Sequence, residues 1–239
     1  MRRPCPGVPF TATLWYNERM SERENTVRAG KGRLITLEGG EGSGKSTQVK
    51  RLVAALRECG REVVVVREPG GTPLAEEVRR LLKDQEADVP VDRAELLLFL
   101  AARAQLVERV IRPALAQGKW VVSDRFSDST LAYQGYGRGL DLELIRRVNA
   151  FACSDLKPDL TLLLDVDPEV SASRMRRREG DTATSADRIE RAGAEFHARL
   201  RQGFRRLAAA EPERIVVIDA NRDETAVWED VWMAMKRFN

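Results

Sequence analysis

The amino-acid sequence predicts an α/β protein built on a five-stranded parallel sheet with helices on both faces. Three observations support this fold class. Apolar runs rich in β-branched residues alternate with segments of helical periodicity along most of the chain, which is the order of elements in a parallel sheet. The glycine-rich segment GGEGSGKST at residues 39–47 directly follows the first apolar run. A chain of 239 residues with 43% apolar residues can also build the core of one such domain.

The first half of the chain carries two predicted strands and three predicted helices. The strands are expected at residues 33–38 and 62–67, and the helices at 45–59, 74–83 and 92–117. Gly60 and Gly118 end the first and third helices, as glycine commonly does. The second strand contains four consecutive valines, a pattern typical of a strand that is buried on both faces.

The remaining strands are expected at residues 120–124, 160–165 and 215–219, and a final helix at 224–237. Acidic residues stand at or just beyond the ends of four strands: Glu38, Glu68, Asp124 and Asp165. Ligands of parallel sheets bind at the carboxyl ends of the strands, so these positions predict a functional site at that edge. For Asp165, capping of the following helix is an alternative explanation.

Charge and composition narrow the classes of partner. Lys and Arg total 40 against 37 Asp and Glu, a net charge of +3, which does not indicate a nucleic-acid partner. No apolar run reaches the length of a membrane span. An odd number of widely spaced cysteines favours a reducing cytoplasm. Residues 1–30 are expected to be a disordered tail before a domain at 31–239, with translation from Met20 as an alternative.

The segment at residues 39–47 matches the phosphate-binding pattern G-x-x-x-x-G-K-[ST]. Its backbone N–H groups can converge on phosphate oxygens, and the following helix adds its positive dipole end. Lys45 is suited to the β- and γ-phosphates, and the Ser46 hydroxyl to Mg²⁺. The pattern therefore predicts binding of a nucleoside triphosphate with Mg²⁺, and the residues of this loop are Gly39, Gly40, Glu41, Gly42, Ser43, Gly44, Lys45, Ser46 and Thr47.

Two further segments acquire a functional interpretation beside this loop. Residues 67–72 read REPGGT, which taken alone is equally consistent with a purely structural turn. Residues 123–126 read SDRF, for which a surface ion pair is the ordinary explanation. Next to a phosphate loop, Asp124 is a candidate Mg²⁺ ligand and Arg125 a candidate bidentate phosphate ligand.

An arginine cluster precedes a Gly-, Thr- and Ser-rich segment in the second half of the chain: Arg174, Arg176, Arg177 and Arg178. A solvated helix face is the common explanation of such a cluster. Here it leads into a flexible segment between two helices, which predicts a mobile lid at about residues 173–187. Phosphoryl transfer needs positive charge on the equatorial oxygens and exclusion of water, and such a lid provides both.

These residues carry a resemblance to bacterial thymidylate kinases over residues 33–237. The shared motifs are LEGGEGSGKST, REPGGTPLAEEVRRLL, LLFLAARAQLVERVIRPAL, VVSDRFSDSTLAYQGYGRG, KPDLTLLLDVDPE and DRIE. Phe126 replaces a common His or Tyr, and the lid is a few residues longer than in relatives. The resemblance implies a nucleoside monophosphate kinase-like fold, a homodimer, and transfer of the ATP γ-phosphoryl group to dTMP, which gives dTDP for dTTP synthesis and DNA replication.

The resemblance also assigns roles in the acceptor site. Glu41 would accept from the sugar 3′-hydroxyl, Phe99 would stack on thymine, and Arg103 would bind its 4-oxo group. Phe99 and Arg103 are four residues apart, so they share one helix face. The implied dTMP-binding residues are Glu41, Glu68, Arg79, Phe99, Arg103, Arg125, Thr130, Tyr133 and Gln134. Packing in the core is the alternative for Phe99 and Tyr133.

Lys45, Arg125 and an arginine of the lid are the candidate catalytic residues. Loop positions 40–43 contain no basic side chain, so the lid has to supply the remaining charge, through Arg176 or Arg178. The single histidine, His197, is expected at the surface. The alternatives are a kinase for dUMP, a nucleic-acid-dependent ATPase and an inactive relative. A homodimer is further supported by residues 94–101, which offer almost no polar face. Burial of this stretch by the neighbouring helix and the N-terminal tail is the alternative.

Overall fold

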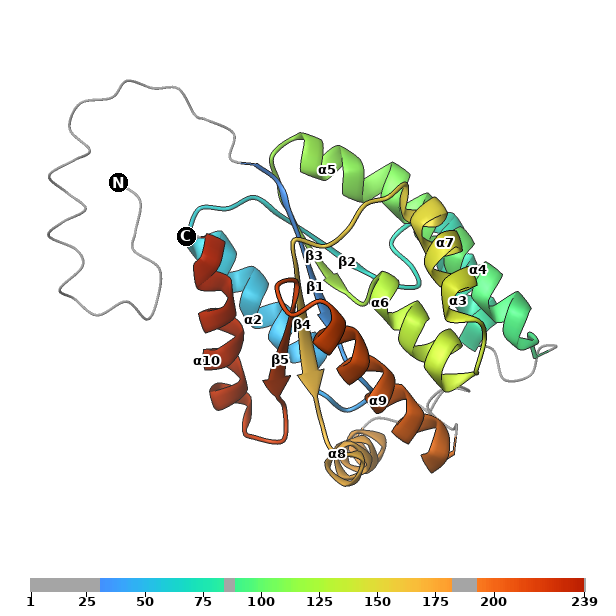
Figure 1. Cartoon of the computed structure of the whole chain (residues 1–239). Coiled ribbons are helices and arrows are strands. Elements are labelled where there is room, and N and C mark those ends of the chain that lie inside the picture. Colours follow the sequence, from blue (N-terminus) through green and yellow to red (C-terminus); the bar gives the residue numbers. More distant parts are fainter. Residues whose placement is uncertain (1–30, 84–88, 182–192, 239) are drawn as a thin grey trace, which may run out of the picture.

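The computed structural model describes residues 31–83, 89–181 and 193–238 (Figure 1). Five parallel strands form one sheet in the order β2-β3-β1-β4-β5. The strands are β1 Arg33–Glu38, β2 Val63–Arg67, β3 Trp120–Asp124, β4 Leu160–Asp165 and β5 Ile215–Asp219. The predicted fold class and the positions of all five strands are confirmed. The tail expected at residues 1–30 lies outside the described residues.

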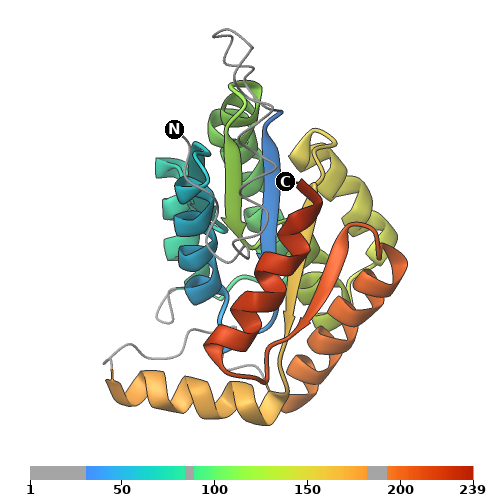
Figure 2. The same ribbon diagram turned by 90° about the vertical axis from the view of Figure 1, so that its left-hand side faces the viewer.

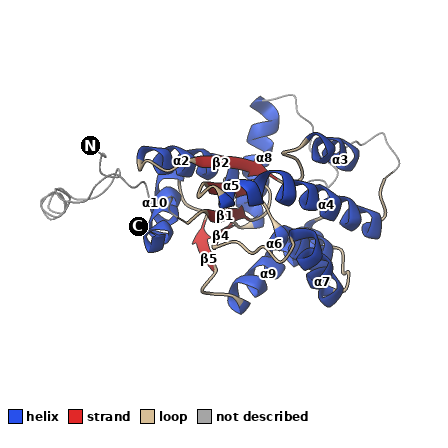
Figure 3. Cartoon of the chain, turned by 90° about the horizontal axis from the view of Figure 1, so that it is seen from above, coloured by secondary structure: helices blue, strands red, loops and turns tan. Residues whose placement is uncertain are grey.

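Helices cover both faces of the sheet (Figure 3). On one face, α2 and α10 pack with the strands in an apolar core. On the other face, α4, α7 and α9 enclose a second core. Helix α8 lies beyond the carboxyl ends of the strands (Figure 2). The α-helices are α2 Lys45–Glu58, α3 Pro73–Lys83, α4 Asp92–Leu106, α5 Arg112–Ala116, α6 Ser127–Thr130, α7 Leu142–Cys153, α8 Pro168–Asp181, α9 Ala194–Ala210 and α10 Glu224–Met235.

The prediction that the valine-rich strand is buried on both faces is wrong. Strand β2 is an edge strand that pairs with β3 alone. Val66 is buried, whereas Val65 on the opposite face is 46% exposed. The local sequence describes the strand but not its place in the sheet, and that place decides its burial.

The long predicted helix at 92–117 is helical throughout but not uniform. Helix α4 passes into a π-helical segment, Val107–Ile111, and then into α5. The apolar stretch within α4 is not enclosed by this chain, because Leu97 is 63% exposed and Phe99 is half-buried. Part of this stretch therefore remains for another surface to cover.

The sequence did not predict the residue ranges of several helices that lie between the strands. Helix α6 continues into a π-helical segment, Leu131–Gly137, and α7 follows it before β4. Helix α8 contains residues 173–181 of the predicted lid. Residues 182–187 of the predicted lid lie outside the described part of the chain. Within the described residues, no helix combines the length and apolar character that crossing a membrane requires.

Candidate active site at the carboxyl ends of the strands

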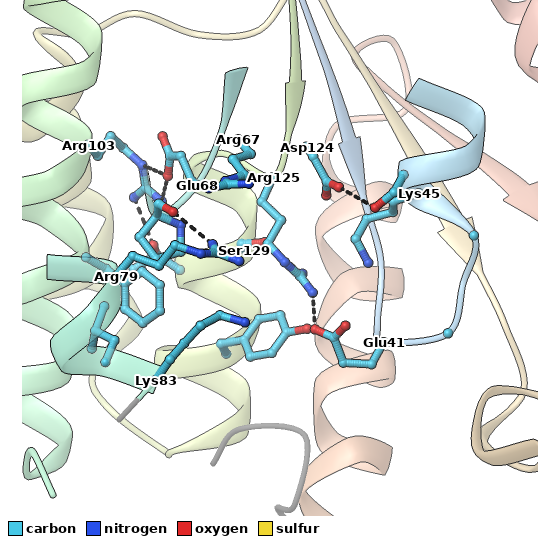
Figure 4. Close-up of a pocket in the computed structure, with 18 of the residues that line it drawn as sticks. Glu41, Lys45, Arg67, Glu68, Arg79, Lys83, Arg103, Asp124, Arg125 and Ser129 are labelled. Atoms are coloured by element: carbon cyan, nitrogen blue, oxygen red, sulfur yellow. Dashed lines mark hydrogen bonds and ion pairs between the residues drawn. The ribbon is translucent and has the colours of Figure 1, made fainter. Parts of the chain in front are cut away.

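A cavity of about 470 Å³ opens at the carboxyl ends of β1, β2 and β3 (Figure 4). The phosphate loop forms one wall, and α3 and α4 form the opposite wall. Every residue that the resemblance assigned to dTMP lines this cavity: Glu41, Glu68, Arg79, Phe99, Arg103, Arg125, Thr130, Tyr133 and Gln134. Residues far apart in the sequence are thus gathered around one space.

The phosphate loop depends on glycine at the points where it turns close to other backbone. Gly42 has a φ of 66°, and a Cβ atom there would lie 2.8 Å from the carbonyl oxygen of Ser171 on α8. Lys45 Nζ donates to the carbonyl oxygens of Gly39 (3.0 Å) and Gly40 (2.7 Å). Burial lowers the pKa of Lys45. The ammonium group is thereby held inside the loop, where phosphate oxygens would approach it.

The two predicted Mg²⁺ ligands lie side by side. Ser46 Oγ donates to Asp124 Oδ2 over 3.0 Å, which joins the start of α2 to the end of β3. Within the described residues, no group of three or more Asp, Glu, His or Cys side chains forms a closed metal site. One hydroxyl and one carboxylate beside a phosphate loop suit Mg²⁺, which commonly keeps water and substrate phosphates as its other ligands.

Arg125 lies in the left-handed region, with a φ of 75°, and this turn aims its side chain across the site. Nη1 donates to the carbonyl oxygen of Gly39 (3.0 Å), and Nη2 is paired with the Glu41 carboxylate. In this arrangement Glu41 faces Arg125 (Figure 4), and its predicted contact with a sugar hydroxyl stays a prediction. The guanidinium also lies 4.9 Å from the ring centre of Tyr133, which favours a cation–π contact.

Glu38 holds the turn that carries Arg125 in place, a role that was not predicted from the sequence. Its carboxylate accepts hydrogen bonds from the backbone N–H of Phe126 (2.8 Å) and of Ser129 (3.2 Å), and from Ser129 Oγ (2.6 Å). Burial, followed by repulsion from Asp128, raises the pKa of Glu38 to about 7. The sequence predicted that Glu38 lies at the end of β1. It did not predict the hydrogen bonds of Glu38, because their partners are about 90 residues away in the chain.

Arg103 is fully buried beneath the cavity and has all five of its N–H donors in use. Nε and Nη2 bind Glu68 Oε2 (2.8 and 2.5 Å), and Nη2 also binds the carbonyl oxygen of Phe126 (3.1 Å). Nη1 binds Thr130 Oγ1 (2.8 Å) and Asn149 Oδ1 (2.6 Å). A direct hydrogen bond to a 4-oxo group would have to share or replace one of these contacts, so the predicted role of Arg103 stays a prediction.

Two polar atoms on the cavity wall have no hydrogen-bond partner among the described residues: Glu68 Oε1 and the Tyr133 hydroxyl. Burial raises the pKa of Glu68, although the Arg103 guanidinium opposes this shift. Buried polar atoms normally find a partner. These two are therefore positioned to contact a ligand or a water molecule within the cavity.

Three cations reach the cavity from the side opposite the phosphate loop: Arg67, Arg79 and Lys83 (Figure 4). Arg79 Nη1 donates to the carbonyl oxygen of Pro69 over 2.9 Å. Arg67 binds both carboxylate oxygens of Glu76. Arg79 was a predicted dTMP ligand, whereas Arg67 and Lys83 were not predicted. The position of Arg67 at the start of the REPGGT segment was the signal that could have indicated it.

The arginine side chains of α8 lie in different parts of the structure. Arg174 lines the active-site cavity, and its Nη1 lies 3.3 Å from the carbonyl oxygen of Gly42. Arg176 instead lines a second cavity behind the phosphate loop, toward α9. The side chain of Arg178 lies outside the described residues. The catalytic roles expected of Arg176 and Arg178 therefore stay predictions, and the contact between Arg174 and the phosphate loop was not predicted.

An open groove of about 480 Å³ runs between α8 and the turn that joins β5 to α10. Its lining includes Arg174, Arg177, Asn221 and Arg222. Arg174 connects the groove to the phosphate loop, because its Nη2 also donates to the carbonyl oxygen of Arg222 over 3.1 Å. Arg174 and Arg177 were predicted only as members of the arginine cluster, and no prediction covered Asn221 or Arg222.

A phosphate loop that forms one wall of a cation-lined cavity is the arrangement of a nucleotide kinase of the phosphate-loop class. A model of the thymidylate kinase family matches residues 37–231. The chain is 53% identical over 200 residues to the thymidylate kinase of Solidesulfovibrio magneticus, covering 83% of this chain and 96% of the relative. It is 49% identical over 204 residues to that of Deinococcus radiodurans, covering 85% and 96%.

The fold comparison agrees with the sequence comparison. The crystal structure of thymidylate kinase from Ehrlichia chaffeensis superposes with a TM-score of 0.67 at 36% identity, covering 86% of this chain and 99% of that one. The chain belongs to the thymidylate kinase family, and it is an enzyme of the kinase class.

Proposed function

We propose that the protein transfers the γ-phosphoryl group of ATP to dTMP, giving ADP and dTDP for dTTP synthesis. The observation that carries this proposal is the shared cavity. The phosphate loop and all nine residues assigned to dTMP line one space at the ends of β1, β2 and β3. This arrangement supports a donor and an acceptor nucleotide meeting across the sheet edge, with their phosphates between Lys45 and Arg125.

The acceptor nucleotide would lie between the phosphate loop and α4. Its base would reach Phe99 and Gln134. Both residues line the cavity and are far from the phosphate loop in the sequence. Its phosphate would lie near Arg125, with Arg79 as a second ligand and Arg67 and Lys83 adding positive potential.

The chemistry is an in-line displacement in which an acceptor phosphate oxygen attacks the γ-phosphorus. The second pKa of a phosphate monoester is about 6, so this nucleophile is largely ionised near neutral pH and needs no basic side chain. Positioning and electrostatic stabilisation then supply the acceleration. Ser46 and Asp124 would hold Mg²⁺, which neutralises phosphate charge when bound.

The base of the donor ATP would occupy the groove between α8 and the β5–α10 turn. Arg174 contacts both the phosphate loop and this turn, so a nucleotide whose phosphates lie in the loop can extend directly into the groove.

We also propose that the enzyme is a homodimer and acts in the cytoplasm, where ATP and the deoxynucleotide substrates are present.

The test is an ADP-release assay with ATP and Mg²⁺ that compares dTMP, dUMP, dCMP, dGMP and no acceptor. Turnover that depends on dTMP is the expected result. A single methyl group contributes about 1–3 kcal/mol to discrimination, so dUMP is the informative competitor and is expected to be about tenfold or more less efficient. ADP release without an acceptor, or a preference for another nucleotide, would overturn the proposal.

A further inference from the structure

A buried carboxylate on α4 contacts the far side of a cavity residue. Glu95 is 1% exposed, and its Oε1 accepts a hydrogen bond from Gln134 Nε2 over 2.9 Å. The other carboxylate oxygen pairs with Arg138 Nη2 over 3.2 Å. Gln134 lines the active-site cavity, whereas Glu95 is not among its lining residues. Glu95 can therefore affect a ligand through Gln134 without lining the cavity itself.

The chemistry of this pair determines how the Gln134 amide is oriented. A carboxylate that pairs with arginine only accepts hydrogen bonds, whereas a glutamine amide has a donor end and an acceptor end. Turning the amide over would place Gln134 Oε1 against Glu95 Oε1, two acceptors without a proton between them. The nitrogen end is thus held on the Glu95 side, and Oε1 is the acceptor that the amide offers to a ligand.

An acceptor at this position distinguishes pyrimidine bases. Thymine and uracil carry a hydrogen on N3 and can donate to Oε1. The N3 atom of cytosine has a lone pair and no hydrogen, so it would oppose Oε1 and leave both acceptors unsatisfied. Arg103 does not make the same distinction in the described arrangement, because its five N–H groups already have protein partners.

We propose that Glu95 is a specificity-determining positioning residue, which fixes the Gln134 amide so that the site selects a base with an N3–H donor. This inference rests on the proposed function. It assigns a role to a side chain that touches no substrate and acts through its neighbour.

The test compares kcat/KM for dTMP and dCMP in the wild type and in Glu95→Gln. A glutamine at position 95 can face Gln134 with either end of its amide, so the Gln134 amide becomes free to turn over. We expect kcat/KM to fall for dTMP and to rise for dCMP, so that their ratio falls about tenfold or more. A role in stability alone would lower both values together and leave the ratio unchanged.

The matched control is Glu108→Gln, the same exchange on the same continuous helix at an exposed position that pairs with Arg112 and Ser154. It is expected to keep the wild-type ratio. The combined variant Glu95→Gln/Gln134→Leu completes the test. Its ratio should equal that of Gln134→Leu, because without the amide Glu95 has nothing to orient.

Two outcomes would overturn the inference: an unchanged dTMP/dCMP ratio in folded Glu95→Gln, or an undiminished effect of that change in the Gln134→Leu background. If Glu95→Gln fails to fold, Glu95→Asp is the second variant. It keeps the negative charge, but its side chain is one methylene shorter, so the carboxylate lies farther from the Gln134 amide. It should lower the ratio in the same direction, and an unchanged ratio would again refute the role. Absence of dTMP-dependent turnover in the wild type would instead refute the proposed function itself.

Discussion

Glu38 illustrates how one buried side chain links stability to the geometry of the site. It accepts hydrogen bonds from Phe126 and Ser129 and thereby holds the turn that carries Arg125. Burial and the nearby Asp128 disfavour its charged form more than the Ser129 hydrogen bond and Arg125 favour it. The folded protein therefore carries a carboxyl group that titrates near neutral pH beneath the phosphate-binding arginine.

This shift predicts a pH dependence of stability. The pKa of Glu38 rises from 4.5 to about 7 on folding, so between these values the unfolded chain has released a proton that the folded protein retains. The Glu38 contribution to the free energy of unfolding therefore decreases as pH rises through this window, by on the order of 3 kcal/mol. In Glu38→Gln this decrease should disappear, which urea denaturation at pH 5, 6, 7 and 8 would measure.

The control is Glu143→Gln, which changes an exposed carboxylate on α7 and should follow the wild-type curve. If the wild type and Glu38→Gln lose the same stability between pH 5 and pH 8, Glu38 does not titrate in this range and the assignment is wrong.

The arginines of α8 give a second prediction at the residue scale. If the lid supplies the charge that the phosphate loop lacks, Arg176→Ala or Arg178→Ala should lower kcat about 100-fold or more with little change in the KM for dTMP. Arg174→Ala should mainly raise the KM for ATP, because Arg174 contacts Gly42 and Arg222 beside the proposed donor groove. An unchanged kcat in both Arg176→Ala and Arg178→Ala would reject the lid as the source of the catalytic arginine.

At the scale of elements, local patterns predicted the strands and the phosphate loop, because each is specified by consecutive residues. The edge position of β2 was not predictable in this way, since it depends on which strand pairs with β3. The same limit applies to the contacts within the site. The motifs named Glu68 and Arg103 separately, but their ion pair joins positions 35 residues apart. Asn149, another partner of Arg103, carries no local signal at all.

The phosphate loop allows an element-scale prediction with a matched control. Alanine at Gly42 would need a positive φ and would place its Cβ 2.8 Å from the Ser171 carbonyl oxygen, so the loop would strain or α8 would move away. We expect a loss of about 1–2 kcal/mol of stability and a higher KM for ATP. A Cβ at Gly40 meets nothing within 4 Å, so Gly40→Ala should retain the wild-type Tm. Equal Tm values for both variants would contradict this account of the loop.

At the scale of the whole molecule, large apolar side chains remain exposed on two helices that pack together. Leu97 on α4 is 63% exposed, and Leu144 and Phe151 on α7 are 52% and 88% exposed. Helices α4 and α7 both belong to the face of the sheet opposite α2 and α10 (Figure 3). Large exposed apolar side chains are candidates for a protein–protein interface, and the proposed homodimer would bury them.

The dimer prediction is tested by the oligomeric state in solution. The wild type is expected to sediment as a dimer, and Leu97→Glu and Phe151→Glu should each shift it toward a monomer with unchanged circular dichroism, because a charge buried without a partner opposes association. Met233 is 59% exposed on α10, across the sheet from the proposed interface, so Met233→Glu should leave the dimer intact. Dissociation by Met233→Glu alone would place the interface on the α2 and α10 face, and a monomeric wild type would reject the dimer.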